Sequence, residues 1–177
     1  MVLSLDISTS CTGYCIFDLG GKLVDSGAIL LNKEKVFFKK VEIIESKIDE
    51  LCLKYQFDTV AIEESLQSFR PGLSSAKTLF TLSKFNGIVQ FICFKKDLDI
   101  KTFNVNTARK IVNIKIDRKS KTKTKDQVAD QVCEHVTLPK KILKSGPRKG
   151  CSVYENYAYD IADAYVIGKA YCIENLK

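Results

Sequence analysis

The sequence predicts an α/β protein with a five-stranded mixed sheet and helices on both of its faces. Three apolar segments open the chain, at 2–8, 12–18 and 22–31, and the glycine pair before the third is typical of a hairpin turn. Two later apolar segments each follow a long helical pattern, which is typical of crossover connections. We therefore expect three antiparallel strands and then two crossover-connected strands, in one domain over residues 1–177.

The first helix has the clearest pattern. Asn32 is its expected N-cap. Apolar residues then recur at alternating spacings of four and three, which places them on one helical face: Phe37, Val41, Ile44, Ile48, Leu51 and Tyr55. This face is expected to pack in the core and to have no other role.

The remaining elements follow from shorter apolar segments and turn residues. We expect strands at 58–65 and 99–106, helices at about 75–94, 126–135 and 155–173, and a short helix from Thr107. Loops are expected at 117–125, which is rich in lysine, serine and threonine, and at 138–150, which contains a Gly-Pro pair.

The basic residues are concentrated in one part of the chain. The net charge is +7, from 28 Lys+Arg and 21 Asp+Glu. Residues 109–149 hold 13 of the basic and 4 of the acidic residues, so the rest of the chain carries 15 basic and 17 acidic residues. Such a block can be a solvated face, but clustered Lys and Arg favour a polyanion such as nucleic acid, because binding releases counterions.

The seven cysteines and the hydropathy point to the compartment. The cysteines form no CxxC pair and are an odd number, which favours reduced, buried thiols over disulfides or zinc. No apolar run approaches the roughly 18–20 residues that span a bilayer. The first strand begins near Val2, so no signal peptide is expected. We expect a cytoplasmic protein without a membrane partner.

Four acidic residues lie at apolar positions. Asp6 lies within the first apolar segment, and Glu63 ends the fourth. Asp160 and Asp163 lie three residues apart in an otherwise apolar helix, which places both on one face. Each could separately be a cap or an ion-pair partner. Burying all four together requires cations, and oxygen ligands without histidine favour Mg²⁺ or Mn²⁺. Two such ions would suit phosphodiester hydrolysis.

These residues resemble the RuvC-type Holliday junction resolvases, which have a ribonuclease H-like fold. "LSLDISTSCTGYCIFD" is similar to the first motif of that family, "VAIEE" to the second, and "DIADA" to the closing D-x-x-D-A motif. The stretch "TLSKFNGIV" at 81–89 resembles the helix of the family's dimer interface, and "KDQV" at 125–128 resembles a stretch whose lysine assists catalysis. The resemblance covers nearly the whole chain.

The resemblance implies a metal-dependent crossover junction endodeoxyribonuclease of recombination and repair, acting as a homodimer on branched DNA. Asp6, Glu63, Asp160 and Asp163 would bind two Mg²⁺ ions per active site, with Mn²⁺ as a substitute, and Lys125 would stabilise charge on the scissile phosphate. No small-molecule cofactor is implied. Paired symmetric nicks would leave 5′-phosphate and 3′-hydroxyl ends.

The DNA-binding residues are less closely matched to the family. The first motif has Ile-Ser where bacterial members have Pro-Gly, which favours a phage or viral relative, acting in the host-cell cytoplasm. An aromatic wedge is expected three residues after the catalytic glutamate, but Leu66 stands there, so Phe69 is the candidate for stacking on an unpaired base. The remaining candidate DNA contacts are Arg70, Arg109, Lys110, Arg118, Lys119, Lys121 and Lys123.

Three other functions are compatible with parts of the sequence. A ribonuclease H-fold nuclease of other specificity, for RNA processing or general debranching, would keep the fold and the acids. An actin-like phosphotransferase also starts with a strand, an aspartate and a Gly/Ser/Thr turn, but 177 residues leave no room for its second lobe. A DNA-binding module without activity is disfavoured by the four intact acids.

Overall fold

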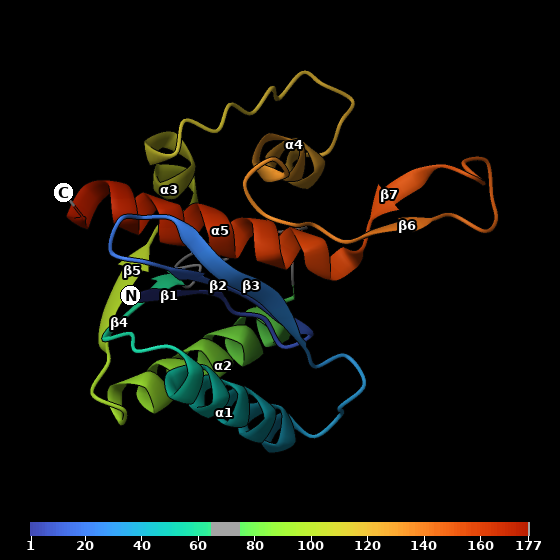
Figure 1. Cartoon of the computed structure of the whole chain (residues 1–177). Helices are drawn as coiled ribbons and strands as arrows, with labels where there is room; N and C mark the ends of the chain where they lie inside the picture. The colour runs from blue at the N-terminus through green and yellow to red at the C-terminus, as the bar shows by residue number, and fades with distance from the viewer. Residues whose placement is uncertain (65–74, 177) are drawn as a thin grey trace.

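The computed structural model describes residues 1–64 and 75–176 and confirms the mixed sheet. The five main strands are β1 (Val2–Asp6), β2 (Cys11–Phe17), β3 (Leu23–Leu30), β4 (Thr59–Glu63) and β5 (Asp99–Phe103), in the order β3-β2-β1-β4-β5 (Figure 1). The first three strands pair antiparallel, and β4 pairs parallel with both β1 and β5. Gly21 in the β2–β3 turn has a φ of 72°, a conformation that glycine adopts without strain.

Five helices cover the two faces of this sheet. They are α1 (Phe37–Lys54), α2 (Ala76–Phe94), α3 (Val105–Ile111), α4 (Thr124–Val132) and α5 (Asn156–Asn175). In Figure 1, α1 and α2 lie on one face, whereas α5 crosses the other face with α3 and α4 packed outside it. The apolar stripe of α1 is confirmed, with Val41, Ile44, Ile48 and Leu51 buried.

The sequence-based boundaries are wrong at several places. Asn32 does not cap α1, because the helix begins at Phe37 and Val36 is its N-cap. The segment expected as a loop at 138–150 contributes to a second, two-stranded sheet, β6 (Lys140–Ile142) and β7 (Ser152–Tyr154). The basic loop ends before Lys125, which lies in the first turn of α4. β1 ends at Asp6, so this residue is at the end of its strand and not within it.

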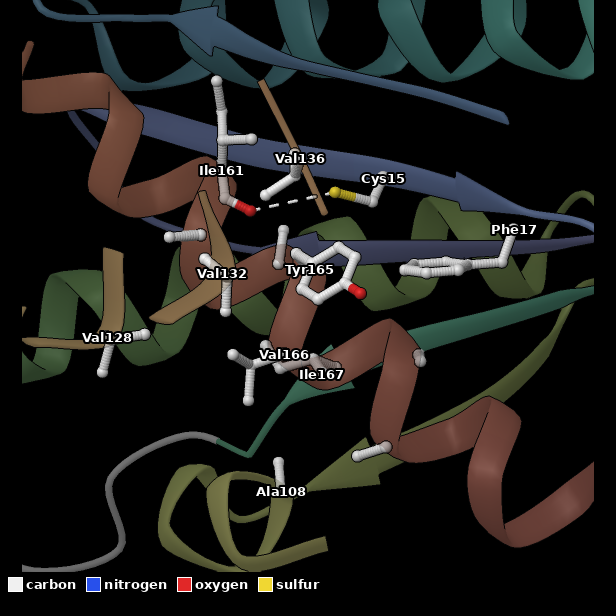
Figure 2. Packing of buried hydrophobic residues seen from close by; sticks show 14 of the residues in the cluster. Cys15, Phe17, Ala108, Val128, Val132, Val136, Ile161, Tyr165, Val166 and Ile167 are labelled. Carbon is white, nitrogen blue, oxygen red and sulfur yellow. Dashed lines mark hydrogen bonds between the residues drawn. The ribbon is translucent and has the colours of Figure 1, made fainter. Parts of the chain in front are cut away.

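The core has two layers because side chains alternate along each strand. Leu3 and Leu5 of β1 pack with α1 and α2. Val2 lies on the opposite face, which packs against α5. Figure 2 shows this second layer, in which Tyr165 of α5 lies against Phe17 of β2, with ring centroids 5.6 Å apart. The helix α5 is therefore the central packing element on its side of the sheet.

All seven cysteines are free, as expected. Four are buried and Cys52 is partly buried, but Cys133 and Cys151 are exposed. The expectation that the thiols are buried is therefore wrong for these two. Over residues 1–64 and 75–176, no helix combines the length and apolar composition needed to cross a membrane.

Candidate active site

Two of the predicted acids lie at neighbouring strand ends. Asp6 is the last residue of β1 and Glu63 the last of β4. The parallel register pairs Leu5 with Ile62, so the two acids follow at the same edge of the sheet. Alternation along β1 places Asp6 on the side of Ser4, whose hydroxyl donates to the Ala164 carbonyl of α5 at 2.8 Å. Both acids therefore face the N-terminal half of α5.

Gly13 brings the other two acids to this edge. It lies on β2 directly opposite Asp6. A Cβ atom at Gly13 would lie 2.0 Å from the Asp160 carbonyl oxygen, so only glycine lets the α5 backbone rest on the sheet here. Asp160 and Asp163, one turn apart on α5, are thereby held beside Asp6. The glycine of the first motif is thus a requirement of helix docking.

The acids perturb one another strongly. Burial raises the pKa of Asp6, and the charges of Asp163, Glu63 and Asp160 raise it further. Burial also raises the pKa of Glu63, although its hydrogen bond with the Asp6 carboxyl acts in the opposite direction. Four carboxyl groups that disfavour one another's ionisation form a site that gains stability from bound cations.

Cys11 is a further member of this group. Burial raises the pKa of Asp160 to about 6, while a hydrogen bond from the Cys11 thiol and the charge of Lys125 act to lower it. The cysteine is buried at the start of β2, where sequence reasoning assigned it only to the core. The C-x-G spacing from Cys11 to Gly13 is the one available signal, because alternation puts both residues on the α5 side.

Arg109 lies within the carboxylate group. Its Nη2 donates to Asp163 Oδ1 at 2.9 Å, and the two side chains are only 17% and 22% exposed. Burial raises the pKa of Asp163, and Arg109 acts to lower it. The Arg109 Nε atom is buried without a hydrogen-bond partner. The sequence placed Arg109 among the DNA contacts, whereas the structure directs it at the acids and leaves its neighbour Lys110 exposed.

Lys125 lies next to the acids on the α4 side. Its Nζ is 4.2 Å from the centroid of the Tyr159 ring. The Tyr159 hydroxyl donates to Asp126 at 2.5 Å, which joins the first turn of α4 to that of α5. The ammonium group is therefore held near Asp160 by an aromatic ring, and no carboxylate of residues 1–64 or 75–176 forms an ion pair with it.

The four acidic side chains are ligands of the chemical type that a hard divalent cation prefers. They offer carboxylate oxygens, with no histidine among the four residues, as Mg²⁺ and Mn²⁺ prefer. Across the described residues, no three His, Cys, Asp or Glu side chains converge closely enough to form a ready-made metal-binding group. Arg109 occupies one oxygen of Asp163, so the acids would have to move toward a bound cation.

The other predicted DNA contacts form a separate exposed segment. Arg118, Lys119, Lys121 and Lys123 are all exposed in the loop before α4. Gln127 fixes this loop: its Oε1 accepts from the Asp117 backbone N–H and its Nε2 donates to the Thr122 carbonyl, both at 2.8 Å. Phe69 and Arg70 lie outside the described residues.

Comparison with known proteins finds RuvC proteins as similar both in sequence and in fold. No family model matches the chain. The chain is 29% identical to the crossover junction endodeoxyribonuclease RuvC of Rickettsia akari over 91 residues, which are 51% of this chain and 55% of the relative. The RuvC of Fusobacterium nucleatum is 26% identical over 91 residues, 50% of this chain and 45% of the relative. The chain thus spans about half the length of the curated relatives it matches.

Solved RuvC structures match almost the whole chain. A T. thermophilus RuvC in complex with a Holliday junction substrate superposes with a TM-score of 0.66 and 16% identity, over 97% of this chain and 92% of that chain. A second Thermus thermophilus RuvC structure gives a TM-score of 0.60 and 17% identity, over 97% and 93%. The five-stranded sheet and its helices therefore have the RuvC fold, which is ribonuclease H-like.

Proposed function

We propose that this chain, a homologue of the RuvC endonucleases in sequence and in fold, is a structure-selective, metal-dependent DNA endonuclease that resolves four-way junctions. The observation that carries the proposal is that four acids from β1, β4 and α5 lie near one edge of the sheet, where the α5 backbone rests on Gly13. The reaction is hydrolysis of one phosphodiester bond per site, leaving a 5′-phosphate and a 3′-hydroxyl.

Asp6, Glu63, Asp160 and Asp163 would hold two Mg²⁺ ions, or Mn²⁺ in their place. When bound, the ions supply Lewis-acid activation of water and neutralise charge at the scissile phosphate. The burial that raises the pKa of Asp6 favours cation binding, because a bound cation removes the cost of ionising this carboxyl. The protein's contribution is to hold the acids on two strand ends and one docked helix.

Lys125 and Arg109 supply the fixed positive charge of the site. The Lys125 ammonium would stabilise negative charge developing on the phosphate, and its position over the Tyr159 ring, beside the acids, supports this role. Arg109 balances Asp163 when no cation is bound and becomes available to a phosphate oxygen when Asp163 turns to a cation. Lys110 and the loop of Arg118, Lys119, Lys121 and Lys123 would contact the DNA backbone, with Phe69 and Arg70 at the crossover.

The outer face of α2 supports a homodimer. Phe80, Gly87, Phe91 and Phe94 are all exposed and recur at spacings of seven, four and three, which places them on one stripe of the helix. A Cβ at Gly87 would have no atom within 4 Å, so a second helix can approach closely there. A two-fold dimer through this stripe would present two sites to the two-fold symmetry of a junction and produce paired nicks.

The test uses an end-labelled synthetic four-way junction and its linear duplex, with Mg²⁺ or EDTA. Paired symmetric nicks that require Mg²⁺ and are absent on the duplex are expected. Asp6→Asn should abolish cleavage and retain junction binding, because the acids act in the reaction while the basic residues bind. Loss of binding by a folded Asp6→Asn protein would contradict this division of roles.

Other outcomes distinguish the remaining functions. Cutting of forks and flaps as well would indicate a general debranching nuclease, and cutting of RNA a ribonuclease. Salt-sensitive binding without cleavage would indicate a binding module. If the protein neither binds nor cuts the junction, the proposal is overturned and a phosphotransferase function is favoured.

A further inference from the structure

The β6–β7 hairpin is a projecting element that the core does not explain. Residues 139–154, here called the basic hairpin, pair in the register Lys140↔Tyr154 to Ile142↔Ser152. Two more backbone hydrogen bonds, Leu143 N–H to the Cys151 carbonyl and Gly150 N–H to the Leu143 carbonyl, extend the ladder. In Figure 1 it extends away from the body beyond the N-terminal end of α5.

Little apolar surface holds the basic hairpin in place. Tyr154 is buried at its base, but Ile142 is 66% exposed. A two-stranded hairpin is marginally stable by itself in water, and like charges on it weaken it further. Gly146 and Gly150, with φ values of 80° and 86°, form the turn region. Packing therefore does not account for the basic hairpin, and charge is its distinguishing feature.

The charge of the basic hairpin is of one sign. It carries five cations and no acidic residue: Lys140, Lys141, Lys144, Arg148 and Lys149. At the base, Lys141 pairs with Glu155 at 2.9 Å, and Lys140 Nζ lies 4.6 Å from the centroid of the Tyr154 ring. Within the described part of the chain, no carboxylate pairs with Lys144, Arg148 or Lys149, and all three are exposed.

This charge lies next to the carboxylate site. β7 leads through Glu155 directly into α5, whose fifth residue is Asp160. The Tyr159 hydroxyl, on the residue before Asp160, donates to Asp126 at 2.5 Å and so ties this end of α5 to the first turn of α4. Lys125 lies over the same tyrosine ring. Cations therefore continue from the hairpin to the edge of the site.

We infer that the basic hairpin is a DNA-binding arm that holds the phosphate backbone of one duplex arm beside the cleavage site, through Lys144, Arg148 and Lys149. Lysine and arginine contacts to phosphates position a protein on DNA without reading its sequence. The hairpin and the loop before α4 would thus contact the substrate at two separate places. This inference rests on the proposed nuclease function and adds to it a specific surface and its partner.

The test compares two triple variants with the same change in charge. One is Lys144→Gln/Arg148→Gln/Lys149→Gln. The control is Lys22→Gln/Lys95→Gln/Lys101→Gln, three exposed lysines away from the carboxylate edge, in the β2–β3 turn, after α2 and on β5. Affinity for a labelled four-way junction is measured by fluorescence anisotropy in EDTA, so that no cleavage occurs, over a series of KCl concentrations.

Each phosphate contact contributes about 0.9 to the slope of log affinity against log salt. The hairpin variant should lose about 2–3 from this slope and therefore bind about 100- to 1000-fold more weakly near 0.1 M KCl, whereas the control should lose less than about 0.5 from the slope. Lys144→Arg/Lys149→Arg, which keeps the charge, should bind like the unaltered protein. This conservative variant also reports on folding, because a purely structural role would not separate it from the glutamine variant.

Equal losses in the two triple variants would overturn the inference, since the effect would then come from net charge alone. An unchanged slope in the hairpin variant would overturn it as well, while leaving the nuclease function intact if the unaltered protein binds and cuts the junction. If the unaltered protein does not bind the junction, the proposed function fails and the inference fails with it.

Discussion

Replacing Arg109 should destabilise the metal-free protein more than the metal-bound protein. Arg109→Gln removes the cation that pairs with Asp163 at 2.9 Å. Because both side chains are less than a quarter exposed, solvent screens the pair little. Removing one partner of such a pair costs about 3–5 kcal/mol when the remaining charge stays ionised.

Protonation limits this cost. Burial already raises the pKa of Asp163, so in the variant this carboxyl can take up a proton instead of staying charged. Protonating it costs about 1.4 kcal/mol for each pH unit above its pKa. We therefore expect the free energy of unfolding in EDTA at about pH 7.5 to fall by about 2–4 kcal/mol. In Mg²⁺, where a bound ion replaces the arginine as the counter-charge, the loss should be below about 1 kcal/mol.

The losses of stability in EDTA and in Mg²⁺ together predict the change in metal affinity. A difference of about 2 kcal/mol between EDTA and Mg²⁺ requires the variant to bind the metal about 30-fold more tightly, because stability and binding are linked. Urea unfolding gives the stabilities and isothermal titration with Mg²⁺ or Mn²⁺ gives the affinity. Arg118→Gln, in the exposed loop, is the matched control. An equal loss with and without Mg²⁺, or unchanged metal affinity, would refute the role given to Arg109.

Three further changes test other parts of the structure. Gly13→Ala should cost about 2–4 kcal/mol, since its Cβ would overlap the Asp160 carbonyl and push α5 from the sheet, and urea unfolding will show no loss if that contact is unimportant. Phe91→Glu, on the exposed stripe of α2, should give a monomer by analytical ultracentrifugation, and a surviving dimer would exclude this stripe as the interface. In EDTA, stability should fall as the pH rises from about 4 through about 6, because the native state retains a proton on Asp160, whose pKa is raised to about 6, after the unfolded chain has released its own. A stability that rises over this range in urea unfolding would contradict the raised pKa.

The sheet and the four acids could be predicted because burial constrains them strongly. An acid at an apolar position is costly, so Asp6 and Glu63 were conspicuous in the sequence. Hydrophobic periodicity likewise identified α1. The details of α3 were not accessible in this way. Which of two adjacent cations, Arg109 or Lys110, faces the acids depends on the phase of a seven-residue helix, and its sequence has too few apolar residues to set that phase.

The basic hairpin was missed for a related reason. Its strands have three residues each and little alternation, and its Gly-Pro pair is typical of a loop. Cys11 was missed because a cysteine in an apolar strand has the same appearance in the sequence whether or not its thiol donates to a carboxylate. These features depend on how distant segments meet, which local patterns do not encode.

The packing of α5 against β1 also bears on when the site is assembled during synthesis of the protein. Ser4 and Ala164, which join the two elements, are 160 residues apart in the chain. Contacts of such separation form late in folding, because the intervening chain must first be ordered. A nascent chain in which α5 has not yet emerged from the ribosome would hold Asp6 and Glu63 without Asp160 and Asp163. The proposed nuclease would therefore remain inert until α5 has emerged, and its activity would begin only when this helix docks on the sheet.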